Sequence, residues 1–259
     1  MAKPKIHPTA IVEPDAKIAD GAEIGPFCIV GKKVKIGKNT KFTSYVVIEH
    51  TEIGKDCTVY PFTSIGLPPQ DIRYKGEKTK VKIGNNNVIR EYSTIHRASV
   101  SGDKITSIGD DNFFMAYVHI AHDCKVGNNE IMANASTLGG HVTVDDYCFL
   151  GGLVAVHQFS RIGAYSMVGG FSAITKDIPP YTTASGDRAK LYGLNAIGLK
   201  RQNFSDSQVR SLKQAYKLLF RSKLTVKEAI ALLRQEGNLS EEVRNLIDFI
   251  EENKRGICR

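Results

Sequence analysis

Three short segments in the middle of the chain carry the residue types of a chemical site. They are His119-Ile120-Ala121-His122-Asp123, Gly139-Gly140-His141 and His157-Gln158-Phe159, and matching positions in them lie 18 residues apart. Imidazole and carboxylate groups can exchange and orient protons near neutral pH. A glycine leaves its backbone N–H open to approach, which is what an oxyanion needs. The spacing therefore points to one composite site, provided the fold brings the segments together.

A six-residue repeat defines the elements that must position these segments. An aliphatic or aromatic residue returns at every sixth position over residues 108–174, and the same period covers residues 6–48. A period of six fits neither an α-helix nor a two-sided strand, and hexapeptide repeats of this kind indicate a parallel β-helix. The sequence therefore predicts a mainly β protein built as a solenoid.

The solenoid predicts which site residues are neighbours. If three hexads make one coil, residues 18 apart lie on adjacent rungs, roughly 4.8 Å from each other. His122 then lies beside Gly140 and Gln158, and Asp123 lies beside His141. We expect these side chains to form one patch, with the Gly140 N–H open to an oxyanion.

Corners and insertions interrupt the repeat. Glycine followed by asparagine or aspartate, as in Ile36-Gly-Lys-Asn39, marks corners with left-handed backbone angles. One excursion covers residues 67–78 and a second covers about 99–107. Loops inserted into a solenoid commonly lie on a binding face, so Asp71 and Arg73 are candidates for the site, with a solvated polar loop as the alternative.

The period changes after residue 180. Ile178-Pro179-Pro180 is expected to end the repeat, because prolines cannot donate to a strand ladder. Apolar residues then follow helical spacing in three stretches that begin after Ser205, Thr225 and Ser240. The sequence predicts a β-helix domain over residues 1–180 and a helical domain over residues 190–259.

Composition excludes several other classes. No apolar run approaches the roughly 18 residues of a membrane span, and the N-terminal residues lack a signal-peptide core, so we expect a cytoplasmic protein without a transmembrane segment. The five cysteines are scattered, without a Cys-x-x-Cys pair, which favours free buried thiols over a disulfide framework or a thiolate metal site. No metal and no cofactor is expected.

Positive charge is concentrated near the C-terminus. The chain has a net charge of +8, and residues 190–259 hold 14 Lys and Arg against 8 Asp and Glu, an excess of 6. These residues lack interleaved aromatic platforms or a nucleic-acid reader motif, so we expect no nucleic acid as partner. An acidic protein or a phosphorylated small molecule fits the charge.

Together these motifs carry a family resemblance. The hexad solenoid and its helical tail, with the ordered His motifs, resemble the UDP-N-acetylglucosamine O-acyltransferases, which catalyse the first step of lipid A biosynthesis. The motifs are Ile24-Gly-Pro-Phe27, Pro69-Gln-Asp71, His119-Ile-Ala-His-Asp-Cys124, Leu138-Gly-Gly-His-Val142, Ala155-Val-His-Gln-Phe159 and Asn195 with Gly198-Leu-Lys-Arg201. The resemblance implies a left-handed parallel β-helix with a C-terminal α-helical domain, and a homotrimer with active sites between neighbouring chains.

The resemblance also implies a reaction and roles. An (R)-3-hydroxyacyl group would pass from acyl carrier protein to the glucosamine 3-hydroxyl of UDP-N-acetylglucosamine. His122 would be the general base, Asp123 would orient it, and the Gly140 N–H would hold the oxyanion. Substrate-binding positions implied in the same way are Asp71, Arg73, His119, His141, His157, Gln158, Gly170, Asn195 and Arg201, the last two for the UDP.

Three positions depart from the family's usual residues. Arg73 replaces a frequent Lys and keeps the charge, whereas Ile197 and Gln202 replace a frequent Glu and Arg in the nucleotide site. The loss of those polar groups bears on UDP binding. Gly170 lies where a larger side chain would shorten the acyl groove, so glycine indicates a long acyl group, although the neighbouring Phe171 could intrude.

Other interpretations remain open on the sequence alone. A zinc enzyme of the carbonic anhydrase type could use His119, His122 and His141 as ligands. A related N-acyltransferase would acylate a 3-amino sugar nucleotide, but it generally carries a further N-terminal domain. A non-catalytic scaffold is a third possibility. Acyl length, and whether the acceptor is a hydroxyl or an amine, do not follow from the residues.

Overall fold

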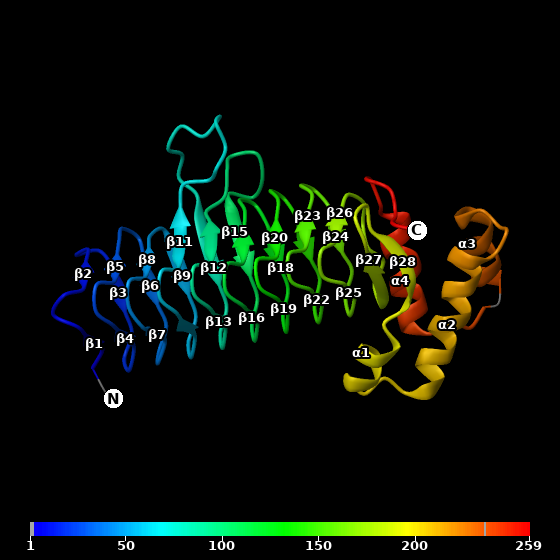
Figure 1. Cartoon of the computed structure of the whole chain (residues 1–259), viewed down its shortest axis with the longest axis horizontal. Helices are drawn as coiled ribbons and strands as arrows, with labels where there is room; N and C mark the ends of the chain where they lie inside the picture. The colour runs from blue at the N-terminus through cyan, green and yellow to red at the C-terminus, as the bar shows by residue number, and fades with distance from the viewer. Residues whose placement is uncertain (1–2, 236) are drawn as a thin grey trace.

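Short strands wind into a three-sided prism with a group of helices at its C-terminal end (Figure 1). This computed structural model describes residues 3–235 and 237–259. Most strands are only two residues long, so each side of each coil contributes one brief strand to one of three sheets. The prism is a parallel β-helix, as the hexads predict, and it is left-handed, as the family resemblance implies.

Each face of the prism is one sheet, in which strands from successive coils are neighbours. The first sheet holds β1 (Lys5–Ile6), β4 (Glu23–Ile24), β7 (Lys41–Phe42), β10 (Thr58–Val59), β13 (Val88–Ile89), β16 (Phe113–Phe114), β19 (Ile131–Met132), β22 (Phe149–Leu150), β25 (Met167–Val168), β27 (Thr182–Ser185) and β28 (Lys190–Leu194). The second holds β2 (Ile11–Val12), β5 (Ile29–Val30), β8 (Val47–Ile48), β11 (Ser64–Leu67), β14 (Thr94–His96), β17 (His119–Ile120), β20 (Thr137–Leu138), β23 (Ala155–Val156) and β26 (Ala173–Ile174). The third holds β3 (Lys17–Ile18), β6 (Lys35–Ile36), β9 (Thr51–Ile53), β12 (Lys80–Ile83), β15 (Ile105–Ile108), β18 (Lys125–Val126), β21 (Thr143–Val144) and β24 (Arg161–Ile162).

Strand register confirms the 18-residue coil at the site. His119 on β17 pairs with Thr137 on β20, which pairs with Ala155 on β23, all in parallel. The hexad residue of each rung points inward, and Phe114, Ile120 and Leu138 are among those fully buried. These inward residues form one continuous core along the prism.

Many corners adopt left-handed backbone angles. The predicted corner residues Asn39, Asp56, Asn86 and Asn129 have φ between 56° and 59°. Aromatic residues also occupy such corners, which the sequence did not indicate. Phe27, Tyr45, Phe62, Tyr92 and Tyr117 form a ladder of rings whose neighbouring centroids lie 4.9–5.1 Å apart. Stacking contributes about 0.5–1.5 kcal/mol per pair, comparable with the roughly 1–2 kcal/mol that a left-handed L-residue costs.

Two loops leave the corner between the second and third sheets and lie side by side (Figure 1). The first, residues 68–79, joins β11 to β12, and the second, residues 97–104, joins β14 to β15. Arg97 fixes the first loop to the coil, because its Nε donates to Tyr74 Oη at 3.0 Å and its Nη1 donates to the Gly66 carbonyl at 2.7 Å. The second loop ends at residue 104 rather than 107, since β15 pairs with all four residues of β12.

The prediction that the repeat ends at Pro179 and Pro180 is wrong. Strand β27 follows the two prolines and extends the first sheet by pairing in parallel with β25. The prolines occupy a corner, where the ladder needs no donor from them, and the next residue restores it because the Tyr181 N–H donates to the Ala164 carbonyl at 2.8 Å. One more rung and the antiparallel β28 therefore lie beyond the boundary expected at residue 180.

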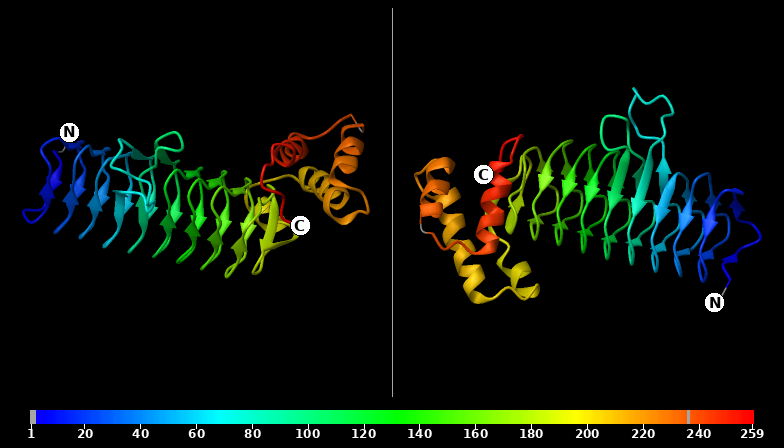
Figure 2. Two further views of the ribbon diagram at one scale, coloured as in Figure 1. Left: turned by 90° about the horizontal axis from the view of Figure 1, so that it is seen from above. Right: turned by 180° about the vertical axis from the view of Figure 1, so that it is seen from behind.

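The C-terminal part is helical, as the sequence predicts (Figure 2). Its helices are α1 (Ala196–Arg201), α2 (Asp206–Arg221), α3 (Val226–Gln235) and α4 (Glu241–Glu251). Ser205 and Gln208 form a capping box at α2, and Ser240 caps α4. The short helix α1 was not predicted.

Within the described residues, no helix is both long and apolar enough to cross a membrane. The five cysteines are free and buried, as expected from their scattered positions.

Candidate active site

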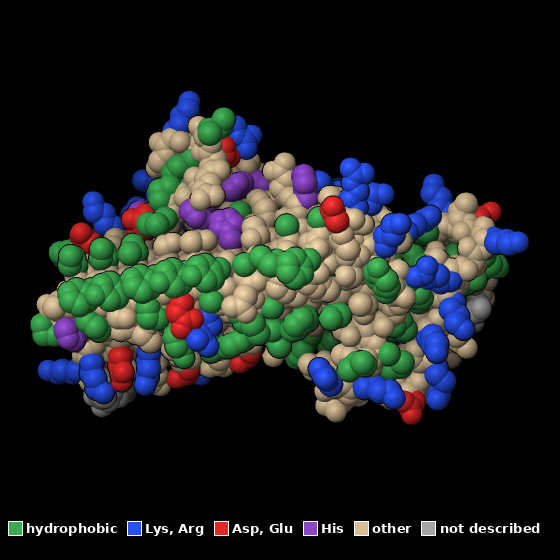
Figure 3. All heavy atoms as spheres, in the orientation of Figure 1, with side chains coloured by type: hydrophobic (Ala, Val, Ile, Leu, Met, Phe, Trp, Pro, Cys, Tyr) green, Lys and Arg blue, Asp and Glu red, His purple; other side chains and the backbone are tan. Residues whose placement is uncertain are grey.

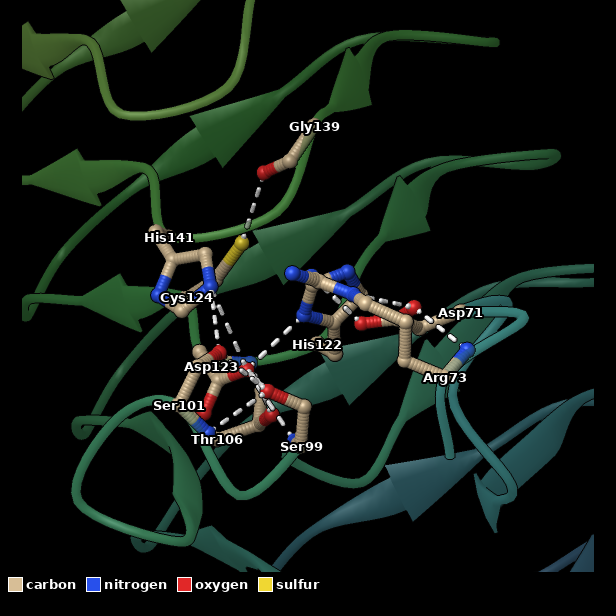
Figure 4. Close-up of polar contacts among 10 residues, drawn as sticks. All are labelled: Asp71, Arg73, Ser99, Ser101, Thr106, His122, Asp123, Cys124, Gly139 and His141. Atoms are coloured by element: carbon tan, nitrogen blue, oxygen red, sulfur yellow. Dashed lines mark hydrogen bonds and ion pairs between the residues drawn. The ribbon is translucent and has the colours of Figure 1, made fainter. Parts of the chain in front are cut away.

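The imidazole of His122 is held by the neighbouring carboxylate. Nδ1 of His122 lies 2.8 Å from Oδ2 of Asp123, and both side chains come from the corner that follows β17 (Figure 4). A carboxylate can only accept, so Nδ1 carries the proton in this contact and Nε2 keeps a free lone pair. His122 is thus set up to accept a proton at Nε2.

Asp123 is fixed from several sides. Its Oδ2 also accepts from the Ser99 hydroxyl at 2.7 Å and from the Ser99 N–H at 3.0 Å, and its own N–H donates to Thr106 Oγ1 at 2.9 Å. Burial tends to raise the pKa of Asp123, but the hydrogen bonds from His122 and Ser99 outweigh it and lower the pKa. The carboxylate is therefore ionised and rigid beside the imidazole.

Gly140 lies against the imidazole of His122, one coil further along the chain. A β-carbon placed on Gly140 would lie 2.7 Å from Nε2 and 2.6 Å from Cε1 of His122. Within residues 3–235 and 237–259, no backbone acceptor takes the Gly140 N–H. Glycine therefore leaves room for the ring and an unused donor next to it.

His141 completes the cluster on the same rung as Gly140. Its Nε2 lies 3.6 Å from Asp123 Oδ2 and 3.3 Å from Ser101 Oγ, and its ring stacks on Phe159 at 4.6 Å. Burial lowers the pKa of His141, so the imidazole is neutral near pH 7. The sequence prediction that Asp123 and His141 are neighbours is confirmed.

The first loop brings an ion pair to the cluster. Arg73 donates to Asp71 through Nε at 3.1 Å and through Nη2 at 2.9 Å, and Figure 4 shows the pair beside the ring of His122. The Arg73 guanidinium lowers the pKa of Asp71 to about 2. The loop thus adds a fixed carboxylate and an exposed cation to the site, in contrast to the alternative of a solvated polar loop without contacts there.

A second pair of histidines lies next to the cluster. His119 Nδ1 contacts Thr94 Oγ1 at 2.7 Å, and its ring centroid lies 5.5 Å from that of His96. Burial, together with the nearby His96 and His122, lowers the pKa of His119 to about 4. His96 in turn contacts the Pro68 carbonyl at 2.6 Å, where the first loop begins. Histidine side chains gather at the base of the two loops (Figure 3).

Sequence reasoning missed His96, Ser99 and Ser101. Ser99 and Ser101 lie in the second loop, where the hexad register gives no positions. His96 lies on the rung before His119, but the insertion lengthens this step of the register from 18 to 25 residues, since Thr94 pairs with His119 and Ile95 pairs with Ile120.

His157 and Gln158 lie further along the same corner. Both are exposed, and His157 Nδ1 contacts Nη2 of Arg255 at 2.6 Å rather than a residue of the His122 cluster. Gly170 lies near the C-terminal end of the prism, where a β-carbon would meet only the Gly152 carbonyl, at 3.1 Å, and its backbone nitrogen. Gly170 lies at the corner between the first and second sheets, across the second sheet from His157 and Gln158, which lie at the corner between the second and third sheets.

The two residues expected to bind UDP lie on helix α1, away from the cluster. Asn195 caps α1 by accepting from the Gly198 N–H at 3.1 Å, and its amide donates to the Tyr165 carbonyl at 2.9 Å. Arg201 ends the helix and is exposed. Among the described residues, neither side chain contacts His122 or its neighbours.

One group of side chains in the described chain could hold a metal ion, namely His122, Asp123 and His141. The zinc alternative has His119 as the third ligand, whereas this group has Asp123 instead. His119 Nδ1 contacts Thr94 Oγ1. Asp123 Oδ2 already accepts from His122 and Ser99, so this oxygen is used in orienting the imidazole.

Comparisons with known proteins agree with this geometry. Residues 177–258 match the family described as UDP-N-acetylglucosamine O-acyltransferase, domain 2, and residues 15–50 match the bacterial transferase hexapeptide family. The chain is 63% identical over 256 residues to an acyl-(acyl-carrier-protein)–UDP-N-acetylglucosamine O-acyltransferase of Thermodesulfovibrio yellowstonii, covering 98% of this chain and 99% of the relative. A protein of the same name from Herminiimonas arsenicoxydans is 48% identical over 259 residues, covering 98% and 99%.

Solved structures give the same result. The UDP-N-acetylglucosamine acyltransferase of Francisella novicida has a TM-score of 0.95 at 40% identity, covering 98% of this chain and 94% of that one. The corresponding protein of Moraxella catarrhalis has a TM-score of 0.94 at 46% identity, covering 98% and 99%. On sequence, fold and site together, the chain belongs to the UDP-N-acetylglucosamine O-acyltransferase family.

Proposed function

We propose that this protein transfers an (R)-3-hydroxyacyl group from acyl carrier protein to the 3-hydroxyl of UDP-N-acetylglucosamine, the first step of lipid A biosynthesis. The observation that carries the proposal is the 2.8 Å contact between His122 Nδ1 and Asp123 Oδ2 next to the free N–H of Gly140. It joins a base with a free lone pair to an oxyanion donor, the two groups that attack of a hydroxyl on a thioester requires.

The reaction then follows from the positions of these groups. His122 Nε2 takes the proton of the sugar hydroxyl as its oxygen attacks the thioester carbonyl carbon. Asp123 stabilises the imidazolium that forms, while the Gly140 N–H donates to the tetrahedral oxyanion. The attack forms the C–O bond; collapse of the tetrahedral intermediate then restores the carbonyl and breaks the C–S bond, and the imidazolium gives its proton to the leaving thiolate. The step needs neither a metal nor a cofactor.

The remaining site residues are proposed to bind substrate. Asp71, Arg73, His119 and His141 surround the cluster and present polar groups to a sugar. His157 and Gln158 lie beyond His122 towards the C-terminal end, and Gly170 lies further along at the opposite edge of the second sheet, so we expect an acyl chain to extend in this direction across that sheet. The small Gly170 is compatible with a long chain, while Phe171, which is 78% exposed, lies beside it.

A homotrimer would complete the site. Asn195 and Arg201 lie at α1, away from His122 of the same chain. A UDP-sugar would therefore bind best between two chains, with His122 from one chain and Asn195 and Arg201 from its neighbour. The aromatic corner ladder supports such packing, because its rings are 45–58% exposed and form part of a long hydrophobic band (Figure 3). Sedimentation that showed a fully active monomer would refute the trimer.

The exposed Ile197 bears on the nucleotide. It is 71% exposed on α1, where it offers only van der Waals contact to a ligand. We expect UDP to be held mainly by charge and backbone groups here, with Arg201 facing the diphosphate.

The helical part is proposed to dock the acyl carrier protein. A groove of about 990 Å³ has an apolar floor that includes Ile230 and is lined by Lys176, Lys227, Arg234 and Arg259. Glu251 also lines it and pairs with Arg234 at 2.6 Å, so the other three side chains carry the excess positive charge. An acidic partner with apolar contact residues fits such a groove. Because both substrates are water-soluble, we propose that the enzyme acts in the cytoplasm.

Product analysis tests the function. Purified protein is incubated with a mixture of 3-hydroxyacyl carrier proteins of different chain lengths and with either UDP-N-acetylglucosamine or the corresponding 3-amino sugar nucleotide, and each product is examined by mass spectrometry. An ester whose formation needs His122 supports the proposal and gives the acyl length. Acylation only of a 3-amino sugar nucleotide would identify the N-acyltransferase instead.

A further inference from the structure

The C-terminal segment of the chain folds back onto the last coils of the prism (Figure 2). The Asp177 N–H donates to the Gly256 carbonyl at 3.0 Å, and the Cys258 N–H donates to the Asp177 carbonyl at 2.8 Å. Cys258 is only 3% exposed and belongs to the core of the prism. Before residue 255, the side-chain amide of Asn253 donates to the Asp177 carboxylate. The chain is therefore anchored on both sides of Arg255, so the position of Arg255 is defined.

Arg255 reaches from this anchored segment to the corner that carries His157. Its Nε donates to the Thr175 carbonyl at 3.0 Å, and its Nη2 lies 2.6 Å from Nδ1 of His157. A guanidinium has five N–H donors and no acceptor. Nδ1 of His157 must therefore be the acceptor, and the single proton of the neutral ring lies on Nε2.

Another arrangement is available to the same ring. The Gln158 carbonyl lies 3.1 Å from Nδ1 of His157 and could accept a proton from it. That bond would require the opposite tautomer, with the proton on Nδ1 and a lone pair on Nε2. Arg255 and the Gln158 carbonyl thus compete for Nδ1, and they leave Nε2 with opposite hydrogen-bonding roles.

We propose that Arg255 is a positioning residue that holds His157 in the Nε2–H tautomer, so that His157 donates a hydrogen bond to an oxygen of the bound substrate. The proposal rests on the proposed function, in which His157 contacts substrate. It gives the anchored C-terminal segment a role in the reaction: 98 residues along the chain from His157, the segment determines whether that imidazole is a donor or an acceptor.

The tautomer can be observed directly. Nitrogen NMR of protein labelled at histidine, with His157→Ala to assign the signals, should show Nε2 protonated in the wild type. In Arg255→Met, which keeps much of the side-chain length, the Nδ1-protonated form should appear. Lys254→Met is the matched control: it removes the same charge from an exposed neighbour and should leave the signals of His157 unchanged.

Kinetics with a short acyl-pantetheine donor test the consequence without the carrier's charge. We expect Arg255→Met to lower kcat/KM about tenfold, the scale of one lost hydrogen bond to a substrate. In a His157→Ala background the same change should cost less than twofold, because Arg255 acts through the missing ring. Arg255→Lys, which keeps one donor, should recover most of the rate and serves if Arg255→Met unfolds.

Three results would overturn the proposal: Nδ1 protonated in the wild type, an unchanged rate in Arg255→Met, or an equal loss with and without His157. If the wild type transferred no acyl group at all, the proposed function would fail, while the NMR result would still decide whether Arg255 sets the tautomer.

Discussion

The ring of His122 occupies the space where a side chain at Gly140 would begin, since a β-carbon there would lie 2.7 Å from Nε2. Gly140→Ala should therefore displace the imidazole while leaving the coil intact. A displacement near 1 Å costs roughly 10²-fold in rate, which steady-state kinetics would detect. Gly193→Ala is the control, because a β-carbon there would meet nothing within 4 Å. Equal activity in the two variants would contradict the role of this contact.

Loss of the proposed base should be severe. His122→Ala is expected to reduce acyl transfer by about 10² to 10⁴, the usual contribution of a general base, without loss of fold. Product formation is measured beside His7→Ala, which changes an exposed histidine near the N-terminus. Near-normal turnover in His122→Ala would remove the basis for the mechanism.

Asp123 should matter because it determines which nitrogen of His122 carries the proton. Asp123→Asn keeps the shape but loses the full negative charge and one acceptor atom, so His122 is no longer held with Nε2 free. We expect kcat to fall roughly 10²- to 10⁴-fold, as when other base-orienting aspartates are changed. Asp103→Asn alters an exposed carboxylate paired with Lys125 and should change kcat little. The idea fails if both variants behave alike.

The pKa of His119, lowered to about 4 from 6.5 mainly by burial, predicts a pH-dependent stability. Between these pH values residue 119 binds more protons in the unfolded chain than in the folded one. The free energy of unfolding is therefore highest above pH 6.5 and falls as the pH drops towards 4. His119→Gln should remove this part of the dependence. Urea unfolding midpoints at pH 7.5 and pH 4.5 would be compared with those of His7→Gln, and identical pH dependence in both variants would count against the assignment.

Carrier docking should be sensitive to salt. Residues 190–259 have an excess of 6 positive charges, and the Debye length falls from about 10 Å at 0.1 M to about 3 Å at 1 M salt. Raising the salt concentration should slow transfer from the acyl carrier protein strongly and transfer from a short acyl-pantetheine much less, at saturating UDP-N-acetylglucosamine. Equal sensitivity of both donors would show that the charge serves another purpose.

Much of this architecture follows from the period of the sequence. A strict hexad sets the register, and the register alone placed His122 beside Gly140 and Asp123 beside His141. Outside the regular hexads, the sequence does not predict which residues contact each other. The contacts of Ser99 and His96 depend on inserted loops whose path comes from long-range partners such as Arg97.

Rules about single residues gave a wrong prediction at Pro179 and Pro180 and gave no prediction for the C-terminal segment. Pro179 and Pro180 fit a corner because the neighbouring residues provide the donors, which a rule about strand prolines does not anticipate. The contact between Arg255 and His157 joins residues 98 apart through a segment without periodicity, so only the folded chain reveals it.

The 18-residue register also limits how the molecule can change length. Removing or adding one full coil in the regular stretch would shift the helical end by about one strand spacing, 4.8 Å, and keep every apolar residue facing inward. Within the regular hexads another number would turn core side chains towards solvent, as a slipped register does in a flat sheet. One coil of the prism is a residue short, since Ile36 pairs with Ile53, and a corner absorbs the difference so that Ile53 stays buried. Length variation in this prism is therefore quantised, and the distance from His122 to the helical end can change only in whole steps, unless a loop at a corner absorbs the difference.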